Sequence, residues 1–156
     1  ELVIDPVRGI PDLARALEAA GIPTQVSDNV RGQLWLKLIL NCAYNAISAI
    51  ARKPYGETVP SPGVKDVMRD VVGECMAVAK AEGVNVPGDV DAAVRKIVET
   101  IPQQYSSTAQ DIMRGKPTEI DYLNGHIVRR GQALGVKTPA NQVLWAMVKL
   151  IESQRA

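Results

Sequence analysis

The chain has 156 residues, of which 22% are charged, and its formal net charge is +1. This length suits one compact core, and the balanced charge indicates no general attraction to nucleic acid or to an anionic membrane. The two cysteines, Cys42 and Cys75, and the lone His126 favour neither a disulfide scaffold nor a metal site. No run approaches the ~20 apolar residues that span a bilayer. We therefore expect a cytoplasmic protein with a small-molecule or protein partner.

Helical periodicity with regular stop signals runs through almost the whole chain. The first ten residues, which begin ELVIDP, read as a strand end or a linker. Capping residues, prolines and glycines then divide the chain into six or seven predicted helices, and we expect no strand pair. The predicted helices span residues 12–20, 27 or 28 to about 52, 61–83, 87–101, 107–114, 117–134 and 139–154. The predicted fold class is all-α.

The second predicted helix contains a regular row of polar residues within the apolar stretch LWLKLILNCAYNAISAI, residues 34–50. Lys37, Asn41 and Asn45 each advance by four residues, a rotation of about 400°, so they share one side of the helix. We call these three residues the polar row. They could form a structural hydrogen-bond ladder from which Lys37 reaches solvent. Alternatively they could line a cleft for a small polar anion, where lysine supplies charge and a proton and the amides orient an oxyacid.

A second polar cluster lies in SSTAQDIMRGKPTEIDYLNG, residues 106–125. The cluster begins with Ser106, Ser107 and Thr108, whose hydroxyl and backbone N–H groups lie at a predicted helix start. These groups could hold a carboxylate or phosphate, or they could simply cap the helix. Glu119 should open the next helix, where the helix dipole favours a carboxylate, and Tyr122 and His126 should share its face. We expect His126 to be packed or solvated rather than a catalytic base.

These two stretches resemble the C-terminal domain of ketopantoate reductases. The quoted motifs are WLKLILNCAYNAISAI and SSTAQDIMRGKPTEIDYLNGHIVRRGQALGVKTPAN, and the likeness runs from about Gly21 to the end of the chain. The family is distantly similar to 6-phosphogluconate dehydrogenases in its helical half. The resemblance implies a two-domain enzyme that uses NADPH to reduce 2-dehydropantoate to (R)-pantoate, a step toward pantothenate and coenzyme A.

The resemblance also implies roles for five residues. Lys37 would be the general acid that protonates the carbonyl oxygen as hydride arrives. Asn41 and Asn45 would bind the substrate, and Ser107 would contact its carboxylate. Glu119 would lie against cofactor and substrate and affect both binding and turnover. Where some members have Asn–Gly–Glu after the long helix, this chain has Tyr55–Gly56–Glu57, so one substrate contact differs.

No strand leads into a Gly-x-Gly-x-x-Gly turn, so the phosphate-binding half of a nucleotide domain is missing from the pattern. We therefore expect residues 1–10 to be a linker from an N-terminal Rossmann domain and residues 11–156 to be a helical substrate-binding and catalytic domain. This chain alone should be inactive, and it could form a homodimer. Two alternatives are a related 2-oxoacid reductase of the same family and a helical dimerisation or interaction module in which the polar row sets register.

Overall fold

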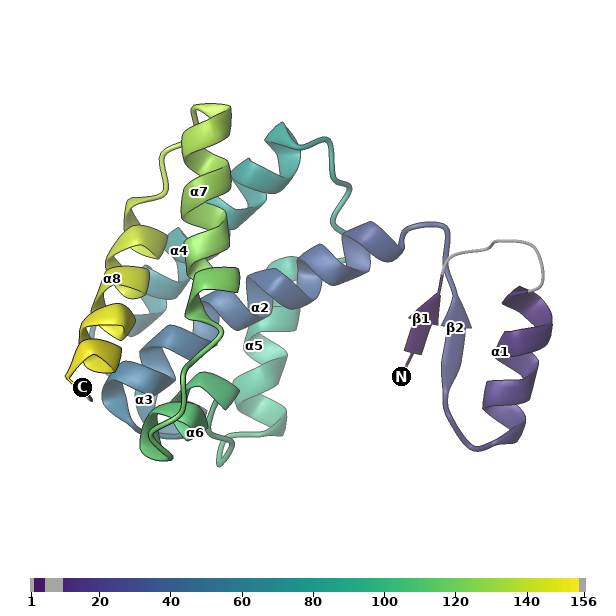
Figure 1. Ribbon diagram of the computed structural model, residues 1–156, viewed down its shortest axis with the longest axis horizontal. Helices are drawn as coiled ribbons and strands as arrows, with labels where there is room; N and C mark the ends of the chain where they lie inside the picture. Colours follow the sequence, from purple (N-terminus) through teal and green to yellow (C-terminus); the bar gives the residue numbers. More distant parts are fainter. Residues whose placement is uncertain (1, 5–9, 155–156) are drawn as a thin grey trace.

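The computed structural model describes residues 2–4 and 10–154, with the side chains of residues 10 and 11 excepted. Within this part of the chain there are eight α-helices, one 3-10 helix and two short strands (Figure 1). The predicted all-α class is confirmed. The elements are β1 (Leu2–Ile4), α1 (Ile10–Ala19), β2 (Thr24–Val26), α2 (Val30–Ala51), α3 (Tyr55–Thr58), α4 (Val64–Ala81), α5 (Val90–Thr100), α6 (Ser107–Met113), η1 (Ile120–Tyr122), α7 (Asn124–Leu134) and α8 (Pro139–Ser153).

The expectation of no strand pair is wrong. β1 and β2 pair in parallel, with Leu2 opposite Thr24 and Ile4 opposite Val26, and α1 lies between them in sequence and packs on β2. Figure 1 shows this small β-α-β unit beside the helical body, joined to it where β2 leads into α2. Strands of three residues are too short to show a period of two, and their pairing depends on residues some 20 positions apart. Residues 5–9 of the expected linker lie outside the described part.

α2 runs through the middle of the helical body and packs against α4, α6 and α8. Its apolar residues are buried on several sides, among them Trp35, Ile39, Cys42, Ala43, Ala46 and Ala49. By length and composition alone this helix could cross a membrane, which was not predicted from the sequence. However, half of its most apolar stretch is buried inside the fold. A core helix explains this composition, because a helix that is apolar nearly all round is covered by its neighbours.

The start of α2 is capped by Asn29, one or two residues after the predicted helix start at residue 28 or 27. Its side-chain oxygen accepts a hydrogen bond from the Gly32 N–H at 3.1 Å, and its Nδ2 donates to the Asn85 carbonyl at 2.9 Å. A Cβ at position 32 would lie 2.2 Å from that carbonyl oxygen. Gly32 therefore lets the α4–α5 loop close against the first turn of α2.

The helix predicted over residues 117–134 is broken. A single 3-10 turn, η1, precedes α7, and Leu123 between them has φ −103° and ψ −107°, which is not helical. Ile120 is completely buried at this break. The gap between the helices predicted to end at about residue 52 and to start at residue 61 contains the four-residue helix α3. Both differences arise because tertiary burial, rather than local propensity, decides the backbone of short segments.

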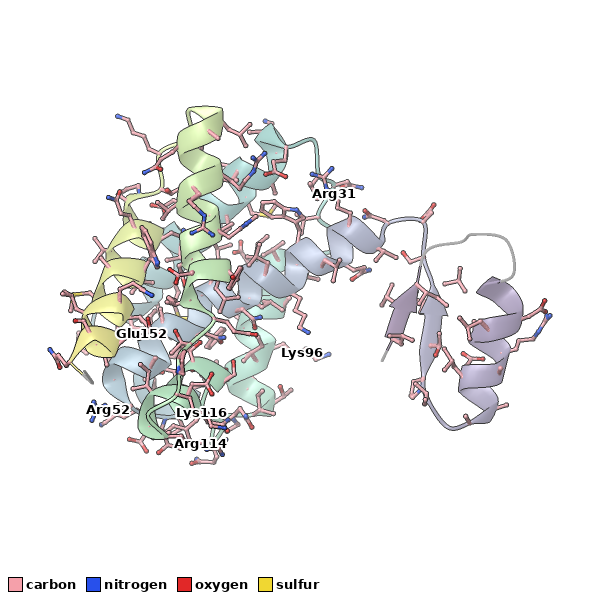
Figure 2. The ribbon with its side chains drawn as sticks, in the orientation of Figure 1. Arg31, Arg52, Lys96, Arg114, Lys116 and Glu152 are labelled. Atoms are coloured by element: carbon pink, nitrogen blue, oxygen red, sulfur yellow. The ribbon has the colours of Figure 1, made fainter. Side chains whose placement is uncertain are left out.

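Glu82, at the C-terminal end of α4, joins three helices through two ion pairs. Its carboxylate is paired with Arg130 of α7 and with Arg31 of α2, the latter at 2.9 Å, and its side chain is 10% exposed. Figure 2 shows Arg31 near the start of α2, close to the junction with the β-α-β unit. The hydrogen bond from Arg130, and then that from Arg31, lower the pKa of Glu82 despite the opposing effect of burial. The carboxylate is therefore ionised in the folded protein at neutral pH.

The Glu82→Gln variant should melt at a lower temperature than the wild type at pH 7, and the difference should shrink below about pH 4. Because folding lowers the pKa of Glu82, its stabilisation is present above the pKa of the unfolded chain and is lost as the pH falls through the folded value. Thermal melts of both proteins between pH 3 and 8 measure this. Glu57→Gln, at an exposed ion pair with Lys53, is the control. A difference in melting temperature that does not vary with pH would contradict the assignment.

Candidate functional site

The polar row passes from the surface of the helical body into its interior. Lys37 is exposed, Asn41 is half-buried, and Asn45 is only 4% exposed. Within the described residues no hydrogen bond joins the three side chains, and Lys37 has no ion pair. The hydrogen-bond ladder considered for this row is therefore not formed. The row instead presents one cation at the surface and one amide at the inner end.

Asn45 and Ser107 are brought together although 62 residues separate them in the chain. The Asn45 Nδ2 lies 3.4 Å from the Ser107 Oγ, a long hydrogen bond. The neighbouring Ser106 fixes this contact, because its hydroxyl donates to the Asn45 carbonyl at 3.1 Å and accepts from the Ala109 N–H at 2.9 Å. The backbone N–H of Ser106 donates in turn to the Ser48 hydroxyl. These bonds fasten the first turn of α6 to α2.

The three hydroxyls at the start of α6 have different roles. Ser106 is the helix cap and is buried, as the capping interpretation proposed, and Thr108 is also buried. Ser107 is exposed, and the contact with Asn45 is the hydrogen bond that its hydroxyl makes within the described residues. Of the three, Ser107 is thus the hydroxyl that can still meet a ligand.

Glu119 lies just before η1 and is exposed. Its backbone carbonyl accepts from the Tyr122 N–H at 2.8 Å, and within the described residues no hydrogen bond or ion pair uses its carboxylate. The structure does not join Glu119 to the other four predicted residues by any such contact. Because the predicted helix is broken at Leu123, Glu119 and His126 do not share a helix face.

His126 is half-buried against Trp35, with ring centroids 6.3 Å apart and an interplanar angle of 64°. Burial lowers its pKa, Glu82 acts in the opposite direction, and Arg129 and Arg130 lower it further. Of the two positions expected for this histidine, packed or solvated, the structure shows the packed one. It is neutral at physiological pH.

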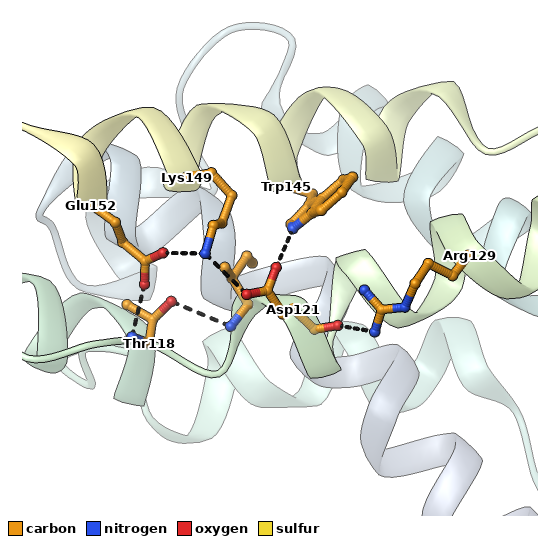
Figure 3. A network of polar contacts seen from close by, with 7 residues as sticks. Thr118, Asp121, Arg129, Trp145, Lys149 and Glu152 are labelled. Carbon is orange, nitrogen blue, oxygen red and sulfur yellow. Dashed lines mark hydrogen bonds and ion pairs between the residues drawn. The ribbon is translucent and has the colours of Figure 1, made fainter.

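The residues on either side of Glu119 belong to a polar network with α8, shown in Figure 3. Asp121 accepts from Trp145 Nε1 at 2.7 Å and from Lys149 Nζ at 2.9 Å. Lys149 also pairs with Glu152 at 2.8 Å, and Glu152 accepts from the Thr118 N–H at 2.8 Å. Sequence reasoning missed this network because its two halves are 24 to 34 residues apart. No local pattern indicates their contact.

Mutual pairing keeps Asp121, Lys149 and Glu152 ionised. The hydrogen bond from Lys149, followed by that from Trp145, lowers the pKa of Asp121. Burial alone would raise the pKa of Glu152, but hydrogen bonds from Lys149 and Thr118 outweigh it and the pKa is lowered. The same bonds, to Glu152 and then Asp121, raise the pKa of Lys149.

Tyr55, which departs from the expected motif, faces the core. It is 8% exposed, and its ring packs edge-on against Tyr44 with centroids 4.7 Å apart. The side chain therefore contributes to packing between α2 and α3.

Two cavities lie away from the five predicted residues. One, of about 540 Å³, has Tyr44, Met68 and Val94 among its lining residues and lies between α4 and α5. The other, of about 880 Å³, lies between α4 and α8. Their walls are mainly apolar and hold none of the polar row. The chemistry predicted from the sequence uses a cation and amide groups, so we place the candidate site at the polar row.

Chemically, the polar row and Ser107 offer what an oxyacid with a neighbouring carbonyl requires. An exposed ammonium can stabilise developing negative charge on oxygen and donate a proton. The amides and the hydroxyl can bind a carboxylate or hydroxyl group without adding charge. Leu34, one turn before Lys37, is 62% exposed.

Comparison with known proteins finds relatives over most of the chain. The family described as ketopantoate reductase PanE/ApbA C terminal matches residues 29–152. The 2-dehydropantoate 2-reductase of Pyrobaculum aerophilum is 37% identical over 144 residues, which cover 92% of this chain and 52% of that protein. The chain thus spans about half the length of such relatives.

Two solved structures are similar to almost the whole of this chain. A PanE/ApbA family ketopantoate reductase from Ralstonia eutropha JMP134 superposes with a TM-score of 0.95 at 61% identity, covering 98% of this chain and 51% of that one. A D-mandelate dehydrogenase, solved as a ternary structure with NADH and anilino(oxo)acetate, superposes with a TM-score of 0.88 at 27% identity, covering 98% of this chain and 67% of that one.

Proposed function

Because the chain belongs to the ketopantoate reductase family, matching its C-terminal part, we propose that it forms the substrate-facing half of an NADPH-dependent 2-dehydropantoate 2-reductase. The observation that carries this proposal is the polar row, which leads from an exposed lysine to an amide held against Ser107. A row of this kind fits a small 2-oxoacid better than a buried structural ladder, because two of its three side chains remain accessible.

In this proposal Lys37 donates a proton to the substrate oxygen. Reduction of a ketone places negative charge on that oxygen, so a cation with a transferable proton is the matching partner. Asn41 and Asn45 orient the substrate, and Ser107 contacts its carboxylate. Glu119 would contact both the substrate and the nicotinamide when they are bound. Neutral amides can fix the orientation without raising the charge of a closed site.

The cofactor would be held mainly by another domain. The described connection from β2 to α2 is Ser27, Asp28 and Asn29, which lacks the glycines of a phosphate-binding turn. The nicotinamide, when bound, would supply the hydride, while the residues of this chain would face it at Glu119 and Lys37. NADPH, rather than NADH, is the cofactor that we propose.

We assign the β-α-β unit to the same nucleotide-binding domain, which moves our proposed boundary from residue 10 to the start of α2. Parallel sheets are normally covered on both faces. Here four large apolar side chains of the unit are at least 39% exposed, namely those of Leu2, Leu13, Ile22 and Val26. Further strands and helices of a Rossmann sheet would cover them. A structure of the full-length protein tests this boundary directly.

Steady-state oxidation of NADPH with 2-dehydropantoate is the direct test. The full-length protein should turn over, and this chain alone should not, because the hydride donor would lack its binding domain. NADH in place of NADPH, at equal concentration, tests the cofactor preference. Turnover by the isolated chain would contradict the two-domain account, and a full-length protein without activity on any 2-oxoacid would contradict the reductase assignment.

A related 2-oxoacid reductase is the second candidate. The similarity to a D-mandelate dehydrogenase at 27% identity favours it, since that enzyme was solved with anilino(oxo)acetate. A panel of branched, hydroxylated and aromatic 2-oxoacids compared by kcat/KM separates the two candidates. Preference for a substrate without the hydroxyl would exclude 2-dehydropantoate as the principal one.

A homodimer remains a prediction, as does a cytoplasmic location. The outer face of α8 exposes three apolar side chains one turn apart, Val143, Met147 and Leu150, and could contribute to self-association. Sedimentation of the full-length protein over a range of concentrations measures this.

A further inference from the structure

We propose that Lys149 is a positioning residue for Glu119, and that the network of Figure 3 holds the Glu119 backbone in place from both sides. This inference rests on the role proposed for Glu119 and goes beyond it, because it assigns a function to residues of α8 that lie outside the polar row and the two motif stretches. The chemistry concerned is the orientation of a carboxylate toward substrate and nicotinamide.

The backbone around Glu119 is fastened at several points. On one side the Thr118 N–H donates to Glu152, and the Thr118 hydroxyl accepts from the Ile120 N–H at 3.3 Å. On the other side the carboxylate of Asp121 is held by α8, and its backbone carbonyl accepts from Arg129 of α7 at 2.6 Å. A segment with this many fixed neighbours has little freedom to reorient.

The carboxylate of Glu119 takes no part in these bonds. The network uses Thr118, immediately before Glu119, and Asp121, two positions after it. The side chain of Ile120, between Glu119 and Asp121, is completely buried. Glu119 itself is exposed and has no hydrogen bond or ion pair to its carboxylate among the described residues. A fixed backbone that carries a free acidic side chain suits a group that must meet a ligand in one orientation.

Lys149 is the centre of this arrangement, since it is the member that bonds both carboxylates. Its side chain is 43% exposed, so the pairs contribute little to overall stability. Gly125 supports the same geometry. A Cβ at that position would lie 2.9 Å from Trp145 Nε1, so a larger residue would displace the indole from Asp121.

The test is a double-mutant cycle in the full-length protein, with kcat and KM measured for 2-dehydropantoate and NADPH. The variants are Lys149→Met, Glu119→Gln and the two combined. Lys149→Met should lower kcat/KM about tenfold in the wild-type background, as expected for a modest misplacement. It should have less than about a twofold effect when Glu119 is already glutamine, because the misplaced group is no longer a carboxylate.

Three further variants complete the design. Lys149→Arg should restore most of the activity, since it keeps the positive charge between the two carboxylates. Trp145→Phe removes one hydrogen bond to Asp121 and should act in the same direction as Lys149→Met, with the same dependence on Glu119. Lys53→Met breaks an exposed ion pair elsewhere and should leave kcat/KM unchanged. Thermal melts confirm that every variant is folded.

An equal loss of activity from Lys149→Met in both backgrounds would overturn the inference, because Lys149 would then act without Glu119. No loss in the wild-type background would overturn it too. In both cases the proposed function would still be supported if the Glu119→Gln and Lys37→Met variants had lost activity. If those two variants were as active as the wild type, the proposed function would fail, and the positioning role with it.

Discussion

Replacing Lys37 with methionine should lower kcat of the full-length protein on the proposed 2-oxoacid substrate by about 10²- to 10⁴-fold, the usual contribution of a general acid, which is the role proposed for Lys37. The variant keeps a side chain of similar length and removes both the charge and the proton. Lys37 is exposed and makes no ion pair within the described residues, so the folded structure loses no partner. The free energy of unfolding should change by no more than about 0.5 kcal/mol.

Single-turnover measurements with saturating NADPH and substrate separate hydride transfer from binding and product release. Lys80→Met, at an exposed position of α4, is the matched control and should keep wild-type kinetics. An unchanged single-turnover rate in Lys37→Met would remove the lysine from the chemical step. A large loss of stability in the same variant would instead indicate that Lys37 supports the fold, as the interaction-module alternative expects.

Replacing Glu74 with alanine should lower the free energy of unfolding by about 2–3 kcal/mol, because it leaves helix α8 without its cap. The residue at the usual capping position, Thr138, makes no side-chain capping bond. Glu74 of α4 takes over this function, since its carboxylate accepts from the Ala140 N–H at 2.8 Å and from the Asn141 N–H at 2.9 Å. It also accepts from the Asn141 side chain at 2.8 Å.

The loss should be large because Asn141 is completely buried, so no water can replace the Glu74 carboxylate at its backbone N–H. For a domain of this size it corresponds to a fall in melting temperature of roughly 5–10 °C. Denaturant titration and thermal melting of Glu74→Ala against wild type measure it. Glu57→Ala, at an exposed ion pair, should shift stability by less than about 0.5 kcal/mol. Equal effects of the two substitutions would refute the capping role.

The capping of α8 by Glu74 could not be predicted from sequence, and neither could the polar network between α8 and the segment around Glu119. Helix starts were predicted from residues next to them, and this succeeded at Ser106, where the capping side chain is local. It failed at α8, where the cap comes from a residue 66 positions earlier in the chain. It also failed around Leu123, because the burial of Ile120 outweighs the helical propensity of the segment.

The sequence by itself determined the all-α class, the order and approximate limits of most helices, and the four-residue spacing that places Lys37, Asn41 and Asn45 on one side of α2. Caps, stop signals and helical periodicity act over a few residues, so a single chain displays them. Tertiary structure alone decided that Lys37 is exposed while Asn45 is buried, that Asn45 meets Ser107, and that α8 holds the segment around Glu119. These relations join residues 24 to 62 positions apart, and only the packing of α2 against α6, and of η1 and α7 against α8, brings them within hydrogen-bond distance.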